Sequence, residues 1–151
     1  LDIAPNYGKR DDVLYYMAIE HGFRSDLRQV RERMFELIND HPTSAHVPLA
    51  YFTFGELFRF EALTDRSKAP LALAAFKEVT RYPQSQNRAH CLSLERIARL
   101  SAPSAQHPAP NYDEAAACAR YPSNANAAGS ANDAQRVDAE VEAGRADVDG
   151  R

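Results

Sequence analysis

Apolar residues recur at spacings of three and four along most of the first hundred positions of the chain. This spacing places the residues of each stretch on one face of an α-helix. Alternation of apolar and polar residues, which is typical of a half-buried strand, is nearly missing. The pattern therefore predicts an all-α chain. The stretches are Leu14, Met17 and Ala18; Leu27, Val30, Met34, Leu37 and Ile38; Tyr51, Phe54, Gly55 and Phe58; Leu71, Ala72, Ala75, Phe76 and Val79; and Leu94, Ile97 and Ala98.

Polar and proline residues predict where these helices begin and end. Ser25 or Asp26 can accept hydrogen bonds from the first amides of the second helix as its N-cap. Pro42 ends that helix, because proline lacks an amide donor and disfavours helix in the residue before it. Asn111 is expected to cap a sixth helix that ends at Pro122.

Three helix ends share a closing proline, and these prolines divide the chain into similar units. Pro42, Pro83 and Pro122 are 41 and 39 residues apart, and each is followed by serine within two residues. A period of 20–50 residues is typical of repeat architectures. A single helical hairpin cannot bury its own apolar face and must stack on a neighbour. The spacing therefore predicts stacked helical hairpins.

With these positions the chain resembles the tetratricopeptide repeat family. Small residues at Ala18, Gly55 and Ala98 would let the second helix of each hairpin approach the first closely. The second repeat carries four extra residues between its helices, and prolines interrupt the third. The motif positions are filled by Leu14, Met17, Ala18, Val30, Met34 and Pro42, then Tyr51, Phe54, Gly55, Phe58 and Pro83, then Leu94, Ile97, Ala98 and Pro122.

The resemblance implies an α-solenoid of about three hairpins. These would span about residues 12–42, 48–83 and 89–122, within a repeat domain over 12–123. In this family the first helix of each hairpin lines a concave groove that binds a peptide or a helix. Aromatic and arginine side chains dominate the energy of such interfaces. Mapped onto this chain, the groove positions are Tyr15 and Ile19, then Phe52, Glu56 and Arg59, then Glu95 and Arg99.

The third predicted helix leaves an alternative open, because it is apolar on nearly every side. A helix of that kind is buried somewhere. Phe52, Phe60 and Tyr15 are covered either by a neighbouring helix of the same domain or by a partner. The alternative to a groove-binding adaptor is therefore a structural subunit. It would form a homodimer or dock into a larger assembly through this helix, with no separate ligand.

Composition separates the front of the chain from its end. Residues 104–151 contain no Leu, Ile, Met or Phe, and acidic residues outnumber basic ones there. We expect an Ala-rich acidic helix or disordered tail over 124–151, with any helix near 130–144. The net charge of −3 argues against a dedicated nucleic-acid or anionic-membrane binder. No apolar run approaches the ~20 residues of a membrane span.

The sequence offers little catalytic or metal-binding chemistry. It has no glycine-rich phosphate loop, and His41 and His46 are interpreted as surface residues of a turn. His90 and Cys91 are adjacent, so chelation of one metal by both, together with Cys118, is awkward. The cysteines are interpreted as small core residues, with a disulfide left open in an oxidising compartment. We therefore expect no enzyme activity, metal or cofactor.

The stretches 48–58 and 75–85 also look like repeats of bacterial envelope proteins. Similar repeats occur in outer-membrane assembly lipoproteins, in Tol-Pal-associated periplasmic proteins and in envelope-spanning motility machines. This resemblance implies a periplasmic or outer-membrane-associated scaffold. The sequence contains neither a signal peptide nor a lipobox cysteine, so a cytoplasmic location stays open.

Overall fold

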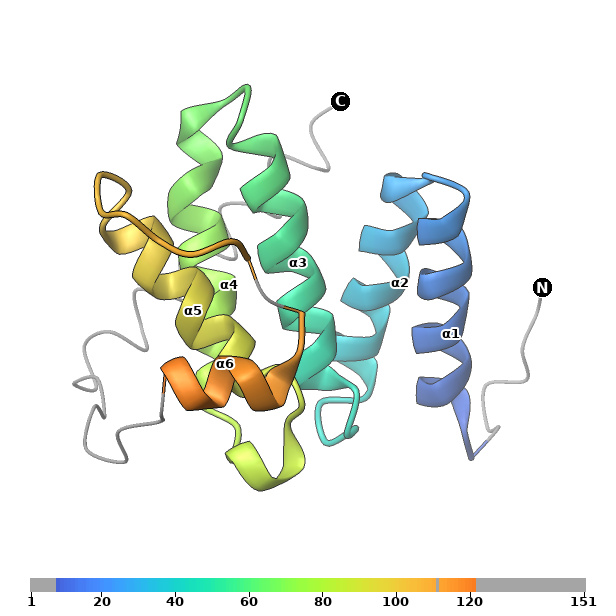
Figure 1. Cartoon of the computed structure of the whole chain (residues 1–151). Coiled ribbons are helices and arrows are strands. Elements are labelled where there is room, and N and C mark those ends of the chain that lie inside the picture. The colour runs from blue at the N-terminus through green and yellow to red at the C-terminus, as the bar shows by residue number, and fades with distance from the viewer. Residues whose placement is uncertain (1–7, 111, 122–151) are drawn as a thin grey trace.

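The chain is folded into helices joined by turns, as a computed structural model shows for residues 8–110 and 112–121 (Figure 1). No strand occurs in these two ranges, so the predicted all-α class is confirmed. Two short 3₁₀ turns, η1 (Arg66–Lys68) and η2 (Gln84–Gln86), lie in the connections. The helices are α1 (Arg10–Phe23), α2 (Leu27–Asp40), α3 (Val47–Glu61), α4 (Ala69–Thr80), α5 (His90–Ser101) and α6 (Glu114–Arg120).

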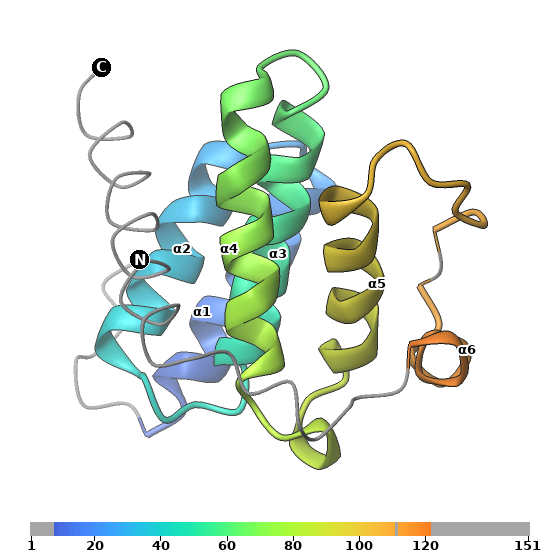
Figure 2. The ribbon, with the colours of Figure 1, turned by 90° about the vertical axis from the view of Figure 1, so that its left-hand side faces the viewer.

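Each helix packs mainly against its neighbours in chain order. α1 and α2 form one antiparallel hairpin and α3 and α4 form the next, beside which α5 lies (Figures 1 and 2). α6 packs on α5 but has only 7 residues. This order of contacts is consistent with a helical repeat. The solenoid itself stays a prediction.

Aspartate side chains cap α2 and α6. The side chain of Asp26 accepts a hydrogen bond from the amide of Gln29 and so caps α2. Ser25, the other candidate, has a left-handed backbone with φ of 59°. Asp113 caps α6 by accepting from two amides of its first turn. Asn111, which was expected to cap this helix, lies outside the described residues.

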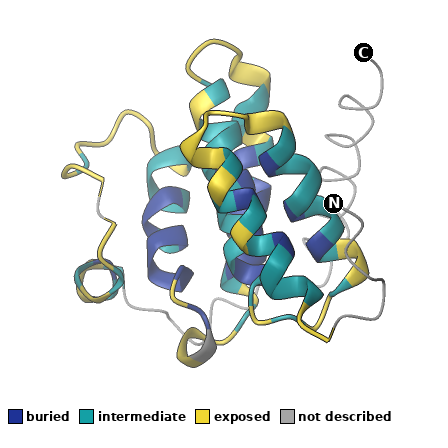
Figure 3. Cartoon of the chain, turned by 90° about the vertical axis from the view of Figure 1, so that its right-hand side faces the viewer, coloured by how far each residue is buried: buried dark blue, intermediate teal, exposed yellow. Residues whose placement is uncertain are grey.

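The main core lies between the two hairpins, and exposed residues gather in the turns (Figure 3). Arginine and glutamate side chains are buried on α5 alongside apolar ones. A second, smaller cluster contains Cys91, Leu92 and Ala117, with Phe52 and Cys118 packed against it. The main core consists of Leu14, Ala18, Val30, Met34, Leu37, Val47, Ala50, Phe54 and Ala75.

Gly55 shows why a small residue is needed between α3 and α4. A Cβ at this position would lie 2.5 Å from Cε1 of Phe76, whose side chain is fully buried. No side chain fits in that space unless the ring moves. The close approach of α4 to α3 therefore depends on glycine at this position, as the repeat pattern predicts.

The observed helices fall within the three expected hairpin ranges, 12–42, 48–83 and 89–122, apart from the first two residues of α1 and the first residue of α3. The third hairpin is incomplete, because a long segment without helix precedes the short α6. The expected tail over 124–151, with its helix near 130–144, lies outside the described residues. Within the described ranges, none of the helices has the length and apolar character to cross a lipid bilayer.

Candidate partner-binding face

Five of the seven predicted groove residues lie on α3 and α5, and Arg96 of α5 links the two groups by pairing with Glu56 of α3 and with Glu95. We call this the α3–α5 face; it is formed by Phe52, Glu56 and Arg59 of α3 and by Glu95, Arg96 and Arg99 of α5. Its three arginines and two glutamates give it a net charge of +1. The face therefore joins the second hairpin to α5 through charged groups rather than through apolar packing alone.

Arg96 is the centre of this face and is only 1% exposed. Its Nε donates to Oε1 of Glu56 at 2.9 Å, across from α5 to α3. Its guanidinium carbon lies 5.9 Å from the centre of the Phe52 ring, within the range of a cation–π contact. A buried arginine is tolerated only when it is paired and hydrogen-bonded.

Glu95 is fully buried, which differs from the exposed groove position that the repeat pattern assigned to it. One carboxylate oxygen accepts a hydrogen bond from Arg99 at 3.0 Å, and the other lies 3.6 Å from Arg96. Two guanidinium groups thus compensate one buried carboxylate. Glu95 holds the arginines in place and cannot itself touch a partner in this conformation.

Arg59 is held by two hydrogen bonds to the carboxylate of Glu56, at 3.1 and 3.0 Å. These bonds raise the pKa of Arg59 more than its partial burial lowers it. Arg59 is therefore a cation that the carboxylate of Glu56 holds in place.

The segment between α5 and α6 crosses this face. We call the described residues of this segment, 102–110 and 112–113, the connector. Both views place the connector on the side of the molecule that carries α3 and α5 (Figures 1 and 2). Arg99 donates a hydrogen bond to the carbonyl oxygen of Pro108. The ring of Tyr112 lies 5.0 Å from the guanidinium carbon of Arg96, although the residue itself is 69% exposed.

The other two predicted groove residues, Tyr15 and Ile19, lie on α1 and pack against the main core. The ring of Tyr15 stacks on His46 with a centroid distance of 4.4 Å. Nε2 of His46 lies 2.7 Å from a carboxylate oxygen of Asp12, so His46 is not a free surface residue of the turn. Burial raises the pKa of Tyr15. These residues join α1 to the start of α3.

Sequence reasoning missed Arg96 and Tyr112. Arg96 follows Glu95 directly and lies outside the motif positions, so the repeat pattern gave it no role. The sequence feature that could have identified Arg96 is its place between two other charged residues of α5, Glu95 and Arg99. Tyr112 was missed because it lies in the proline-rich segment, to which helical periodicity assigns nothing. The sequence of residues 102–113 contains one tyrosine, Tyr112, and no phenylalanine.

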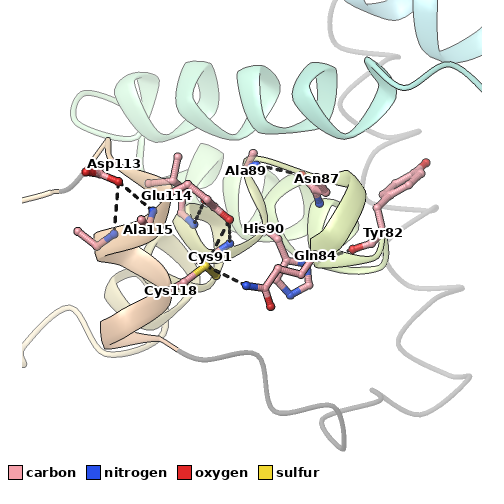
Figure 4. The surroundings of a disulfide bond; sticks show 12 residues. Tyr82, Gln84, Asn87, Ala89, His90, Cys91, Asp113, Glu114, Ala115 and Cys118 are labelled. Carbon is pink, nitrogen blue, oxygen red and sulfur yellow. Dashed lines mark hydrogen bonds between the residues drawn. A yellow bond between two sulfur atoms is a disulfide. The ribbon is translucent and has the colours of Figure 1, made fainter.

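A disulfide joins Cys91 of α5 to Cys118 of α6 (Figure 4). This corrects the interpretation of the two cysteines as mere core residues. The carboxylate of Glu114 accepts hydrogen bonds from the backbone amides of Cys91 at 2.8 Å and Leu92 at 3.1 Å. A residue of α6 therefore caps the start of α5. The side-chain amide of Gln84 donates to the sulfur of Cys118 at 3.1 Å.

Within the described ranges, the two cysteines and Glu114 form a group that could hold a metal ion by the distances between its ligand atoms. Ligand atoms of Cys91, Glu114 and Cys118 lie within 4.8 Å of one another. The two sulfurs are bonded to each other, however, and a disulfide does not supply thiolate ligands. His90, which the sequence placed beside this pair, instead has its Nδ1 3.0 Å from the carbonyl oxygen of Tyr82.

Comparison with known proteins finds no match to a family model, to a curated protein or to a solved structure. The interpretation of the α3–α5 face therefore depends on its geometry and charge.

Proposed function

We propose that the chain is a non-enzymatic adaptor that binds a peptide or helical partner on the α3–α5 face, as the tetratricopeptide resemblance implies. The observation that carries the proposal is the connector. A nonhelical stretch of chain already lies on this face, with a backbone carbonyl on Arg99 and an aromatic ring on Arg96. A surface that binds one nonhelical segment has the groups to bind another.

The energetics of the face also support binding. Glu56 and Glu95 hold the three arginines in fixed positions, so little side-chain freedom is lost when a ligand arrives. Fixed guanidinium groups beside an aromatic ring are typical of the residues that dominate interface energies. The net charge of +1 favours a neutral or weakly acidic peptide.

A location in the bacterial envelope, as part of a larger assembly, belongs to the same proposal. The disulfide between Cys91 and Cys118 supports it, because such bonds persist mainly in oxidising compartments such as the periplasm.

The test is a selection of peptides of about twelve residues from a random display library against the full chain. The dissociation constant of each selected peptide is then measured by fluorescence anisotropy. Arg59→Ala should weaken binding by about tenfold or more, because Arg59 lies at the edge of the face. Arg28→Ala is the matched control, since Arg28 is exposed on α2 and pairs with Glu32. Equal affinity for both variants would contradict the proposal.

One observation favours the alternative, a structural subunit that associates through the region of α3. Phe60 at the end of α3 is 62% exposed and Leu63 in the following turn is 74% exposed. Phe23, at the turn between α1 and α2, is 83% exposed. Both turns lie at the same end of the molecule, and an ion pair between Arg31 and Glu61 joins their helices (Figure 1).

Sedimentation at increasing protein concentration tests this alternative. A dimer that Phe60→Glu dissociates would support the structural subunit. A monomer that keeps its peptide affinity in the Phe60→Glu variant would support the adaptor. Phe52 does not distinguish the adaptor from the structural subunit, because its side chain is half-buried within the chain. Its ring centre lies 5.6 Å from that of Phe76.

A further inference from the structure

The connector contacts the α3–α5 face at two points, and these two contacts are of the kind that a bound peptide would make. The carbonyl oxygen of Pro108 accepts from Arg99, and four positions later the ring of Tyr112 lies against Arg96. Most of the connector is exposed to solvent, so these few contacts, rather than burial, hold it on the face.

We propose that the connector is an internal ligand that occupies the α3–α5 face, and that the Cys91–Cys118 disulfide keeps it there. The partner of the face is then an extended, proline-containing peptide with an aromatic residue about four positions after the carbonyl that Arg99 binds. This inference rests on the proposed function and adds to it the class of partner and the control of access.

The class of partner follows from the chemistry of the connector. Proline favours the extended conformation and lowers the entropy lost on binding, so proline-rich segments suit a shallow surface. An aromatic ring gains a cation–π contact with a fixed guanidinium, as the ring of Tyr112 does with Arg96. The sequence between Pro103 and Tyr112 has three prolines and no charged residue, which matches the weak charge of the face.

The disulfide acts as the latch because the other contacts of α6 are few. A helix of 7 residues is unstable on its own, and Ala117 is its only buried residue. Beyond the disulfide, α6 is held by the hydrogen bonds of Glu114 to the start of α5 and by that of Gln84 to the sulfur of Cys118. The connector is thus tied at one end by α5 and at the other by a covalent bond. An external peptide must displace a segment whose local concentration is high.

Reduction would open the face. A dithiol reductant transfers two electrons to the disulfide, and its own two thiols become a disulfide. The two protons go to the sulfurs of Cys91 and Cys118, which become free thiols. The connector then has only its noncovalent contacts, and an external peptide competes with it on more equal terms.

The experiment measures binding of a fluorescent peptide with the sequence of residues 102–113, APSAQHPAPNYD, to the full chain. The oxidised protein, the protein reduced by a dithiol and the Cys91→Ser/Cys118→Ser variant are compared, with circular dichroism as the check of folding. We expect binding that is about tenfold or more tighter after reduction and in the double variant. A peptide with alanine in place of its tyrosine is the matched control and should bind much more weakly.

A second variant keeps the test independent of the disulfide. Tyr112→Ala in the oxidised protein removes the ring from Arg96 and should also raise the affinity for the external peptide. Limited proteolysis of the connector is measured in parallel, and cleavage should become faster after reduction.

Two results would overturn the inference, and they are distinguishable from failure of the proposed function. Equal peptide affinity before and after reduction, with unchanged proteolysis, would show that the disulfide is no latch, while the face would still bind peptides. Faster proteolysis without binding of the connector peptide would show that the partner belongs to another class. In that case the proposed function stands only if peptides from the display library still depend on Arg59.

Discussion

At the scale of single residues, the buried ion pairs of the α3–α5 face determine what each side chain can do. Arg96 is buried together with Glu95, and each compensates the charge of the other. A buried pair adds little net stability over an apolar replacement of both partners, but removal of one partner leaves an uncompensated charge. The face is therefore sensitive to single substitutions at positions that look like ordinary helical surface in the sequence.

Arg96→Met should destabilise the protein by about 3 kcal/mol, because Glu56 and Glu95 lose a buried cation. The measurement is urea unfolding followed by circular dichroism. Arg28→Met is the control, since it removes only an exposed partner of Glu32 and should leave the urea midpoint almost unchanged. Equal effects of the two substitutions would contradict the central position of Arg96.

Gly55→Ala should lower the free energy of unfolding by about 1–3 kcal/mol, because its Cβ would meet the buried ring of Phe76. Gly22→Ala is the matched control on α1. Its Cβ would lie 3.8 Å from a methyl group of Val30, an ordinary contact, and alanine is the better helix former. Thermal unfolding should therefore show a loss for the first substitution and no loss for the second.

Glu36 makes part of the stability dependent on pH. Partial burial raises its pKa, but hydrogen bonds from Arg10 at 2.6 Å and Arg33 at 2.9 Å outweigh burial and lower the pKa below the ordinary 4.5. A carboxyl group with a depressed folded pKa stabilises the protein above its unfolded pKa, and this stabilisation is lost as the pH falls through the folded value.

Glu36→Gln should therefore lower the melting temperature by about 2–4 °C near neutral pH. The difference from wild type should shrink progressively below about pH 4.5, where the wild-type carboxyl becomes protonated as well. Melting temperatures of both proteins across this range provide the measurement. A difference that does not change with pH would show that the ion pairs of Glu36 are not its cause.

At the scale of elements, the helices follow from periodicity and the last of them follows from a covalent bond. α1 to α5 each carry a face of apolar residues at helical spacing, which is why the sequence predicts them. α6 is rich in alanine and has little to bury, so its packing depends on Cys118 and Glu114. Helical periodicity contains no information on either contact.

Loss of the disulfide should lower the free energy of unfolding by about 2–4 kcal/mol, since it closes a segment with a sequence separation of 27. Denaturant unfolding of the wild type with and without a dithiol provides the measurement. The Cys91→Ser/Cys118→Ser variant should unfold like the reduced wild type and show no response to the dithiol. A wild type with the same stability in both conditions would contradict the dependence of α6 on the bond.

At the scale of the whole molecule, the sequence predicted the all-α class, but not that Arg96 links α3 to α5. The repeat pattern placed Glu95 and Arg99 on an open groove, because it describes helix faces and not the segments that cross them. The structure buries Glu95 and lays the connector over Arg99. Tyr112 and Arg96 could not be predicted, because their contact joins a nonhelical segment to a position outside the motif.

The most direct test of the α3–α5 face as the partner site is the map of amide chemical shifts when a selected peptide is added to the isotopically labelled full chain. The largest changes in amide chemical shift should be at Phe52, Arg59 and Arg99. In the Arg59→Ala variant, the same peptide should no longer cause these shift changes. Changes confined to the ends of the two hairpins, at Phe23, Phe60 and Leu63, would contradict the adaptor and place the partner on the exposed turns.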